Sequence, residues 1–399
     1  MEEVKQKLLI IGERFFPEEF LINDVVKFLQ ENNFNCQIIT HQPSYGTGKI
    51  YEGYKNSLLS NDKYWDAEIY RISFLNGYKN NVLIKVINYF WFVFWGIYVV
   101  LFKIKETDKI LIYQTGPLTQ AIIGIVAKWK FKKKLYIWTW DIWPDSVFGY
   151  GFKRNIVTKS ILNSFVKFVY RKCDHIWISS PGFREVISKF TNKECLEVPN
   201  WVVASDNMSK VNNVVFKDGF HFTFTGNVGK VQNLENVILG FHDAFKGKEN
   251  IFLNIVGGGS NIDELKKLVT KYEVSNIIFW GIRPYSEMEC FYNNSNILII
   301  SLKNGSVWDL YLPSKFQSYL NAKVPIFGVI DGTVKSLIQE NKLGVTSNPD
   351  DIKDISKGFL DCYNNQPSLK ISVDKQADNV NKRYDQTNIK KLILEKLVT

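Results

Sequence analysis

The chain contains 399 residues, of which 45% are hydrophobic and 15% aromatic, so it can bury more than one core and cannot be disordered throughout. Its formal net charge of +10 favours an acidic partner, such as a phosphorylated substrate or an anionic lipid surface. Nucleic acid is not expected as a partner, because the sequence has neither zinc-finger spacings nor a long basic run.

The first half of the chain is predicted to alternate strands and helices. The first helix carries an apolar stripe at Val25, Val26, Phe28 and Leu29, and a longer helix is expected over residues 156–172. A strand before and after the first helix makes a β-α-β opening, which is typical of a parallel sheet. The predicted strands of this half span residues 7–12, 36–40, 109–113, 135–138 and 175–179.

The most apolar segment is 82–104, and it allows three interpretations. Its uncharged part, residues 86–102, is at the lower limit for a helix that spans a bilayer, about 17 residues. A strand is predicted directly after it, so the chain must return to the sheet, which argues against a span. Aromatic residues flanked by Lys85, Lys103 and Lys105 favour a helix that lies at an anionic membrane surface. A helix buried in the protein core remains the alternative.

Asp141 and Asp145 follow the predicted strand 135–138, at the edge where open α/β sheets bind their ligands. We therefore expect Asp141 to face a substrate. The alternative is that both aspartates are solvated loop residues, since aspartate is mostly exposed in folded proteins.

A strand, a glycine turn and a helix follow one another at residues 220–245. Alternating phenylalanines indicate the strand, Gly226 and Gly229 form the turn, and the helical apolar pattern begins at Val231. Such a turn directs free N–H groups and a helix N-terminus at one point, which favours a phosphate, and Lys230 adds positive charge. An ordinary structural turn is the alternative, because many such turns bind nothing.

Four loops of the second half follow predicted strands, so they should converge at one edge of a parallel sheet. A nucleotide diphosphate fits this edge, because glycine loops let the backbone approach the phosphates and Lys315 and Lys230 can neutralise them. The backbone at Ile282 and Arg283 could hydrogen-bond a base. The alternative for Lys315 is a surface lysine at the start of a helix. The four loops are Gly226–Gln232, Gly257–Gly259, Gly281–Arg283 and Asn304–Lys315.

Several longer phrases of the sequence are similar to one protein family. RFFPEEFLINDVVKFL is followed by HQPSYGTGKIYEGYK, DIWPDS follows a strand, and the second half contains GNVGKVQNLENVILGF and LPSKFQSYLNAKVPI. Over essentially the whole chain, these phrases resemble family 4 retaining glycosyltransferases, in the sub-group that assembles bacterial surface polysaccharides such as O-antigen, capsule and exopolysaccharide.

The resemblance implies a GT-B fold, an α/β architecture in which two Rossmann-like domains face a cleft. It implies an acceptor-binding domain at 1–204, a linker at 205–219 and a domain that binds the nucleotide sugar at 220–374. Residues 375–399 are then expected to form a C-terminal helix that packs back on the first domain.

The activity implied is retaining transfer of a hexose or N-acetylhexosamine from a nucleotide sugar, often a UDP-sugar. The acceptor implied is a saccharide linked to undecaprenyl diphosphate, and the product is an α-linkage. Such enzymes need neither a metal nor another cofactor. The widely spread cysteines and the absence of a secretory pattern at the N-terminus predict a cytoplasmic protein, which we expect at the inner face of the plasma membrane.

The site residues implied fall into two groups. Lys315, Lys230 and Asp141 are expected to act in catalysis, with Asp141 orienting the acceptor hydroxyl. The expected substrate-binding residues are Gly226, Asn227, Gly229, Gln232, Gly257, Gly258, Gly259, Ile282, Arg283, Asp309, Leu312, Ser314 and Gln317.

The chain departs from the family pattern where two glutamates normally stand, because Leu310 and Ser318 occupy those positions. Gln317 or Asp309 would then contact the ribose in place of the second glutamate. Two alternative functions stay open. One is a sugar-nucleotide 2-epimerase of the same fold, which acts without an acceptor. The other is a catalytically silent, membrane-associated partner in a polysaccharide assembly complex.

Overall fold

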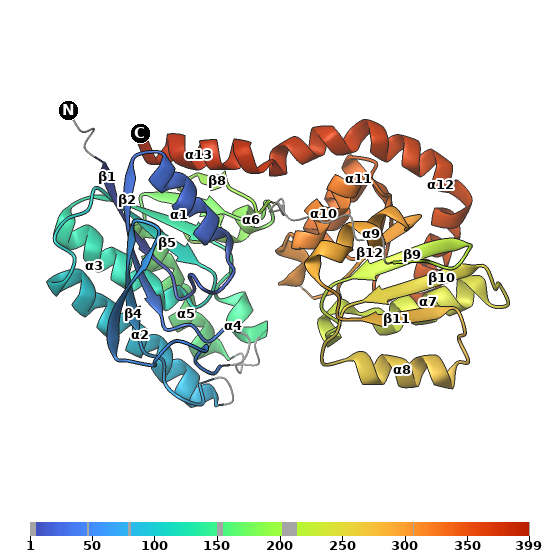
Figure 1. Ribbon diagram of the computed structural model, residues 1–399, viewed down its shortest axis with the longest axis horizontal. Coiled ribbons are helices and arrows are strands. Elements are labelled where there is room, and N and C mark those ends of the chain that lie inside the picture. Colours follow the sequence, from blue (N-terminus) through green and yellow to red (C-terminus); the bar gives the residue numbers. More distant parts are fainter. Residues whose placement is uncertain are drawn as a thin grey trace. The chain divides into compact units, whose positions relative to one another are not determined.

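The protein is described by a computed structural model that places residues 5–45, 48–78, 81–149, 155–201, 214–305 and 307–398. The chain divides into two compact units, Met1–Pro199 with Lys390–Thr399, and Asn200–Ile389. Each unit is built around its own sheet, with helices on its faces (Figure 1). Most of the predicted linker 205–219 lies outside the described residues, which resume at Val214.

The sheet of the first unit has the strand order β3-β4-β2-β1-β5-β6-β7-β8. Its neighbouring strands are parallel except for the antiparallel pair β3 and β4. The inner strands are runs of buried apolar residues, as expected for a sheet covered on both faces. The strands are β1 (Gln6–Ile11), β2 (Phe34–His41), β3 (Leu59–Tyr64), β4 (Ala67–Ile72), β5 (Lys109–Gln114), β6 (Lys134–Thr139), β7 (His175–Ile178) and β8 (Cys195–Glu197).

Helices of the first unit connect these strands. The long helix α5 begins at a capping box, in which Asn155 and Thr158 satisfy each other's backbone N–H groups, and it occupies the predicted range. The helices are α1 (Leu21–Glu31), α2 (Val82–Phe102), η1 (Leu118–Gln120), α3 (Ala121–Phe131), α4 (Asp145–Gly149), α5 (Ile156–Lys172) and α6 (Phe183–Ser188).

The sheet of the second unit has the order β11-β10-β9-β12-β13-β14, and all its neighbouring strands are parallel. One side packs against a cluster rich in phenylalanine, in which Phe222, Phe241 and Phe359 contact one another edge to face. The strands are β9 (Phe220–Thr225), β10 (Ile251–Val256), β11 (Ile277–Gly281), β12 (Ile297–Ser301), β13 (Ile326–Val329) and β14 (Gly344–Ser347).

The helices of the second unit follow its strands in turn. They are η2 (Lys230–Gln232), α7 (Leu234–Phe245), α8 (Ile262–Lys271), η3 (Tyr285–Glu287), α9 (Met288–Asn293), η4 (Trp308–Leu310), α10 (Ser314–Ala322), α11 (Gly332–Glu340) and α12 (Ile352–Asn381).

The C-terminal helical region is longer than its predicted range of 375–399. Helix α12 already begins at Ile352, continues through Pro367, and is followed by η5 (Lys382–Tyr384) and α13 (Gln386–Val398). The chain from Lys390 onward belongs to the first unit, where the Lys390 ammonium lies 2.8 Å from the Asp24 carboxylate. The prediction began too late because the middle of α12 is polar, and its buried positions are widely separated.

Candidate active site

The middle of the second sheet contains a topological switch point. β9 and β12 are neighbours, and the chain continues from β9 to β10 and β11 on one side and from β12 to β13 and β14 on the other. Open α/β sheets bind ligands beside such a point, outside the carboxyl ends of the strands. The loops that start at Gly226 and at Leu302 follow these two strands, so the predicted phosphate loop lies at this position.

The first three glycine loops pack on one another through their backbones. The N–H of Gly226 donates to the carbonyl of Val256 at 2.9 Å, and that of Gly257 donates to the carbonyl of Gly281 at 2.8 Å. Gly257 has φ +134°, and a Cβ there would lie 1.9 Å from the carbonyl oxygen of Gly226, so only glycine fits. Among the described residues, no backbone partner is recorded for the N–H groups of Asn227 and Gly258, which can therefore receive an anion.

Lys315 brings its ammonium group to the same edge from the first turn of α10. Its Nζ lies 3.8 Å from the ring centroid of Phe224, and a Cβ on Gly226 would be 3.4 Å from it. Burial lowers the pKa of Lys315 to about 7. Within the described part of the chain, no carboxylate forms an ion pair with this lysine, so its charge is available to an anionic ligand.

The other two basic candidates lie differently. Lys230 is exposed in η2, next to the turn. Arg283 donates to the carbonyl of Trp280 at 3.1 Å and lies 3.7 Å from Glu287, so its guanidinium is turned back toward its own loop. Ile282, beside it, is 85% exposed and is thus free to meet a ligand.

The two candidates for the ribose contact differ in whether their polar groups already have a hydrogen-bond partner. Gln317 is buried, and its amide nitrogen donates to Asn200 at 2.7 Å, so this group already has a partner. Asp309 lies in η4, and its Oδ1 is buried without a hydrogen-bond partner among the described residues. Burial and the neighbouring charge of Asp331 raise the pKa of Asp309. Asp309 is therefore the better candidate.

The remaining expected binding residues lie close to these elements. Ser314 is the exposed first residue of α10, and Leu312 is buried just before it. Gly229 directly precedes η2, and its N–H donates to the side-chain oxygen of Gln232 at 3.0 Å. Gln232 thus stabilises the turn, and Gly259 lies exposed in the neighbouring loop.

The first sheet has a switch point of its own, between β1 and β5. Glu13 follows β1, the loop with Thr115 and Gly116 follows β5, and Asp141 follows β6. A Cβ on Gly116 would lie 3.2 Å from Glu13 Oε2, so these loops meet. Asp141 is 6% exposed, which rules out the solvated loop residue considered as its alternative.

Glu13 is a site residue that our sequence reasoning did not include. It is buried, its N–H donates to Gln120 at 3.1 Å, and its Oε1 has no hydrogen-bond partner among the described residues. Burial raises the pKa of Glu13 to about 7, although the charges of Arg14 and Lys85 act in the opposite direction. Its position directly after a strand, like that of Asp141, was the signal that could have identified it.

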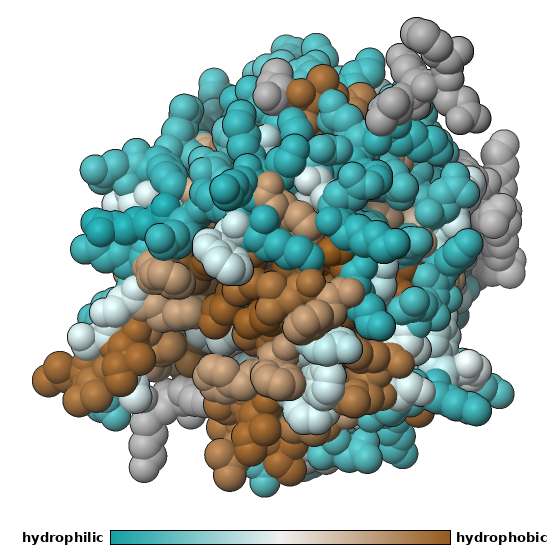
Figure 2. Space-filling model, turned by 90° about the vertical axis from the view of Figure 1, so that its left-hand side faces the viewer, coloured by the Kyte–Doolittle hydropathy of each residue, from teal (hydrophilic) through white to brown (hydrophobic). Residues whose placement is uncertain are grey.

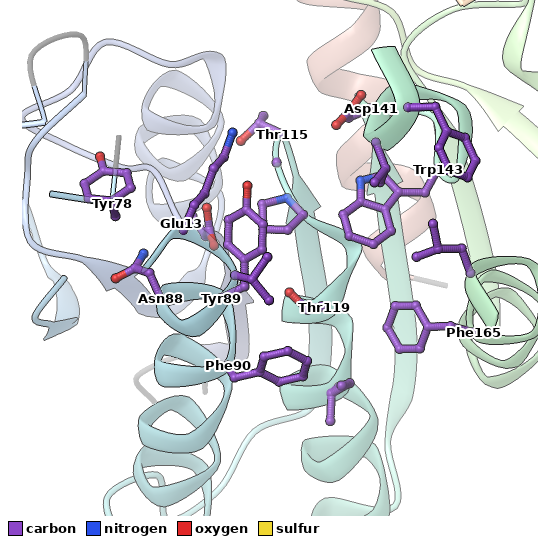
Figure 3. A pocket seen from close by; sticks show the side chains of 18 of the residues that line it. Glu13, Tyr78, Asn88, Tyr89, Phe90, Thr115, Thr119, Asp141, Trp143 and Phe165 are labelled. Carbon is purple, nitrogen blue, oxygen red and sulfur yellow. The ribbon is translucent and has the colours of Figure 1, made fainter. Parts of the chain in front are cut away.

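Glu13 and Asp141 both line a cavity of about 1140 Å³ in the first unit. Figure 3 shows Glu13, Thr115 and Asp141 toward one end, and Phe90 and Phe165 toward the other. The polar end coincides with the carboxyl edge of the sheet. No cluster of histidine, cysteine, aspartate or glutamate that could hold a metal ion occurs among the described residues.

Comparison with known proteins extends this description. Residues 205–382 match the family model described as Glycosyl transferases group 1. The probable glycosyltransferase WbjE of Pseudomonas aeruginosa is 22% identical over 62% of this chain, and the match covers 62% of its own length. An uncharacterized glycosyltransferase of Methanocaldococcus jannaschii, MJ1069, is 24% identical over 99% of both chains.

Solved structures show the same fold over the whole chain. Sucrose-phosphate synthase from Thermosynechococcus elongatus superimposes with a TM-score of 0.68 at 11% identity, covering 99% of this chain and 98% of that one. Anabaena HepE in complex with UDP gives a TM-score of 0.67 at 10% identity, covering 98% and 100%. The predicted GT-B fold is thus confirmed. Together with the sequence matches, the findings support a glycosyltransferase.

Proposed function

We propose that the protein is a retaining glycosyltransferase of family 4, which moves a hexose or N-acetylhexosamine from a UDP-sugar to a saccharide linked to undecaprenyl diphosphate. The observation that carries the donor assignment is the ammonium of Lys315, which is packed between Phe224 and Gly226 at the second switch point without a carboxylate partner among the described residues. HepE, which shares the fold, is a UDP complex, and this supports UDP as the nucleotide. WbjE, a probable glycosyltransferase, supports the transfer of a sugar but not the choice of acceptor.

The reaction breaks the bond between the anomeric carbon and the UDP phosphate, and the acceptor oxygen bonds to that carbon on the same face. Negative charge develops on the departing diphosphate, where Lys315 and the N–H groups of Asn227 and Gly258 stabilise it. Asp141 orients the acceptor hydroxyl, and the hydroxyl proton passes to the leaving phosphate. None of these roles requires a metal or another cofactor, so we expect EDTA to leave turnover intact.

Release of UDP tests this proposal and separates its alternatives. Purified protein is incubated with a panel of UDP-sugars, with and without saccharides linked to polyprenyl diphosphate. A transferase releases UDP only when a suitable acceptor is present and yields an α-linked product. Epimerised UDP-sugar without an acceptor would identify a 2-epimerase. Absence of both reactions across the panel, in protein that binds UDP, would favour a silent partner of an assembly complex.

We further propose that the protein works at the inner face of the plasma membrane, where such an acceptor resides. α2 is long and apolar enough to cross a bilayer, but only 28% of its most apolar stretch is buried, which disfavours a core helix. Lys85, Lys103 and Lys105 can attract anionic lipid, at about 1 kcal/mol for each residue near the surface. Membrane-bound protein should therefore be released by high salt or alkaline carbonate. Retention after carbonate washing would indicate a true span.

A further inference from the structure

The cavity of the first unit extends far beyond the group of polar residues at the sheet edge. Its volume of about 1140 Å³ lies above the ~300–1,000 Å³ of ordinary small-molecule pockets. Away from the sheet edge, it is lined mainly by aliphatic and aromatic side chains of α2, α3, α4 and α5. These include Val86, Ile122, Val147, Ile161, Leu162 and Phe165.

A sugar would be poorly accommodated in this apolar part. Saccharide hydroxyls need hydrogen-bond partners, and burying them against aliphatic and aromatic side chains without partners is unfavourable. Polar groups that can meet hydroxyls include Glu13, Thr115 and Asp141, which lie toward the other end of the cavity (Figure 3). The lining therefore fits a ligand with a polar head and a long apolar tail.

The apolar part of the cavity reaches an exposed apolar surface. Phe90 of α2 and Ile161 of α5 line the cavity, yet they are 58% and 63% exposed. Further large apolar side chains are exposed on the same two helices. They are Val82, Leu83, Ile87, Phe94 and Phe102 on α2 and Ile156, Val157 and Phe168 on α5. Figure 2 shows apolar side chains gathered on the lower part of the face that it presents.

We propose that this cavity binds the hydrocarbon chain of the lipid-linked acceptor, which enters from the membrane between α2 and α5. The inference rests on the proposed function, and it adds a binding site for the part of the substrate that does not react. The hydrocarbon chain of the acceptor lies along Val86, Ile122 and Leu162, while its saccharide end reaches Glu13 and Asp141 at the sheet edge. The exposed faces of α2 and α5 lie against the membrane surface, so the hydrocarbon chain moves from the bilayer to the cavity along apolar side chains.

Binding of isoprenyl monophosphates to the full-length protein tests the proposal, and it does not require the identity of the acceptor saccharide. Geranyl and farnesyl monophosphate are titrated below their micelle concentrations, with methyl phosphate as the chainless probe. Saturating UDP occupies the donor site, and the fluorescence of Trp143, which lines the cavity, contributes to the signal. We expect saturable binding that is at least about tenfold tighter for farnesyl than for geranyl, because more apolar surface is buried.

A cavity-filling substitution locates the site. Leu162→Trp should weaken farnesyl monophosphate binding at least about tenfold, whereas Ser164→Trp, exposed on the same helix outside both the cavity and the apolar face, should leave it unchanged. Ile122→Trp fills the cavity from α3 and serves if Leu162→Trp does not fold, as judged by UDP affinity and thermal unfolding. UDP affinity itself should be the same in all these variants.

The outcomes distinguish the proposals. Equal affinity for farnesyl and methyl phosphate, or undiminished farnesyl binding in both folded cavity variants, would overturn the lipid-chain site while leaving the transferase standing. A stable dimer that excludes farnesyl monophosphate would mean that a second copy of the chain covers this face, and it would overturn the site as well. Failure of the wild type to bind UDP would instead count against the proposed function.

Discussion

The two units present the same sheet-edge position with opposite chemistry. At the switch point of the second unit, the surface is mainly backbone, with three glycine loops hydrogen-bonded to one another and with Lys315, which has no carboxylate partner among the described residues. At the switch point of the first unit, the surface is made of side chains, including the buried acids Glu13 and Asp141 and a large apolar cavity.

This difference corresponds to what the two halves of a sugar-transfer reaction require. A diphosphate is small and always charged, so fixed N–H groups and one ammonium recognise it. A lipid-linked saccharide varies in its sugars and carries an apolar chain, so it is recognised by cavity shape and by side chains. Substitutions in one unit should therefore affect one ligand and spare the other.

The largest effect is expected for Lys315→Met in the second unit. It removes the cation that faces the departing diphosphate, so turnover should fall about a hundredfold or more. UDP affinity should also decrease, whereas farnesyl monophosphate binding in the first unit should not. Lys266→Met, on the exposed face of α8, is the matched control and should retain activity. Turnover near that of the wild type in folded Lys315→Met protein would remove Lys315 from the mechanism.

Asp141→Asn should produce the complementary pattern from the first unit. Loss of the carboxylate weakens orientation of the acceptor hydroxyl, so transfer should fall roughly thirtyfold. UDP affinity, measured by calorimetry, should stay unchanged. Asp145→Asn is the control, since Asp145 follows the same strand but does not line the cavity. An equal loss of UDP binding in Asp141→Asn would show that Asp141 is structural or contacts the donor.

Prediction from the sequence was better for the glycine loops of the second unit than for the side-chain site of the first unit. Strands β9 and β10 end directly before Gly226 and Gly257, as predicted, because a glycine turn between strand and helix is a local signal. Even there, the partner of Gln317 was missed, since Asn200 lies 117 positions away in the sequence. Contacts between such distant residues leave no local pattern.

The limit of prediction from the sequence is clearer in the first unit. The cavity is formed by residues from Glu13 to Phe165, which only the folded chain brings together. The hairpin of β3 and β4 was not predicted, because β3 is a polar edge strand without the usual apolar alternation. The apolar segment 82–104 was recognised, yet its periodicity did not reveal that one side of α2 lines a cavity and another is exposed.

Burial of Glu13 should appear in the pH dependence of stability. Between its ordinary pKa of 4.5 and its raised pKa of about 7, the folded protein keeps a proton that the unfolded chain has lost. The contribution of this group to stability is therefore greatest below pH 4.5 and decreases as the pH rises to about 7. Glu13→Gln, which cannot ionise, should be similar to the wild type at pH 4.5 and more stable than it at pH 8 by up to about 3 kcal/mol.

Urea unfolding at these two pH values measures the effect. Glu31→Gln, exposed at the end of α1, is the matched control and should follow the wild type at both. A constant difference between Glu13→Gln and the wild type would mean that Glu13 does not titrate in this range.

The smallest effect, and the most direct test of the difference between the two units, is the proton taken up when UDP binds. Burial holds the pKa of Lys315 at about 7 in the free protein, so at pH 8 most molecules carry a neutral amine there. A diphosphate beside the amine favours its charged form, so UDP binding at pH 8 should take up close to one proton, roughly the full charge of the lysine. At pH 6, the lysine is already charged, so UDP binding should take up few protons.

Calorimetry in two buffers that differ in ionisation enthalpy counts these protons, and Lys315→Met should bind UDP without the proton uptake at pH 8. Farnesyl monophosphate, bound in the first unit, should show no uptake that depends on Lys315. If wild type and Lys315→Met took up the same number of protons with UDP, the ammonium at Gly226 would not be the group that meets the donor phosphates.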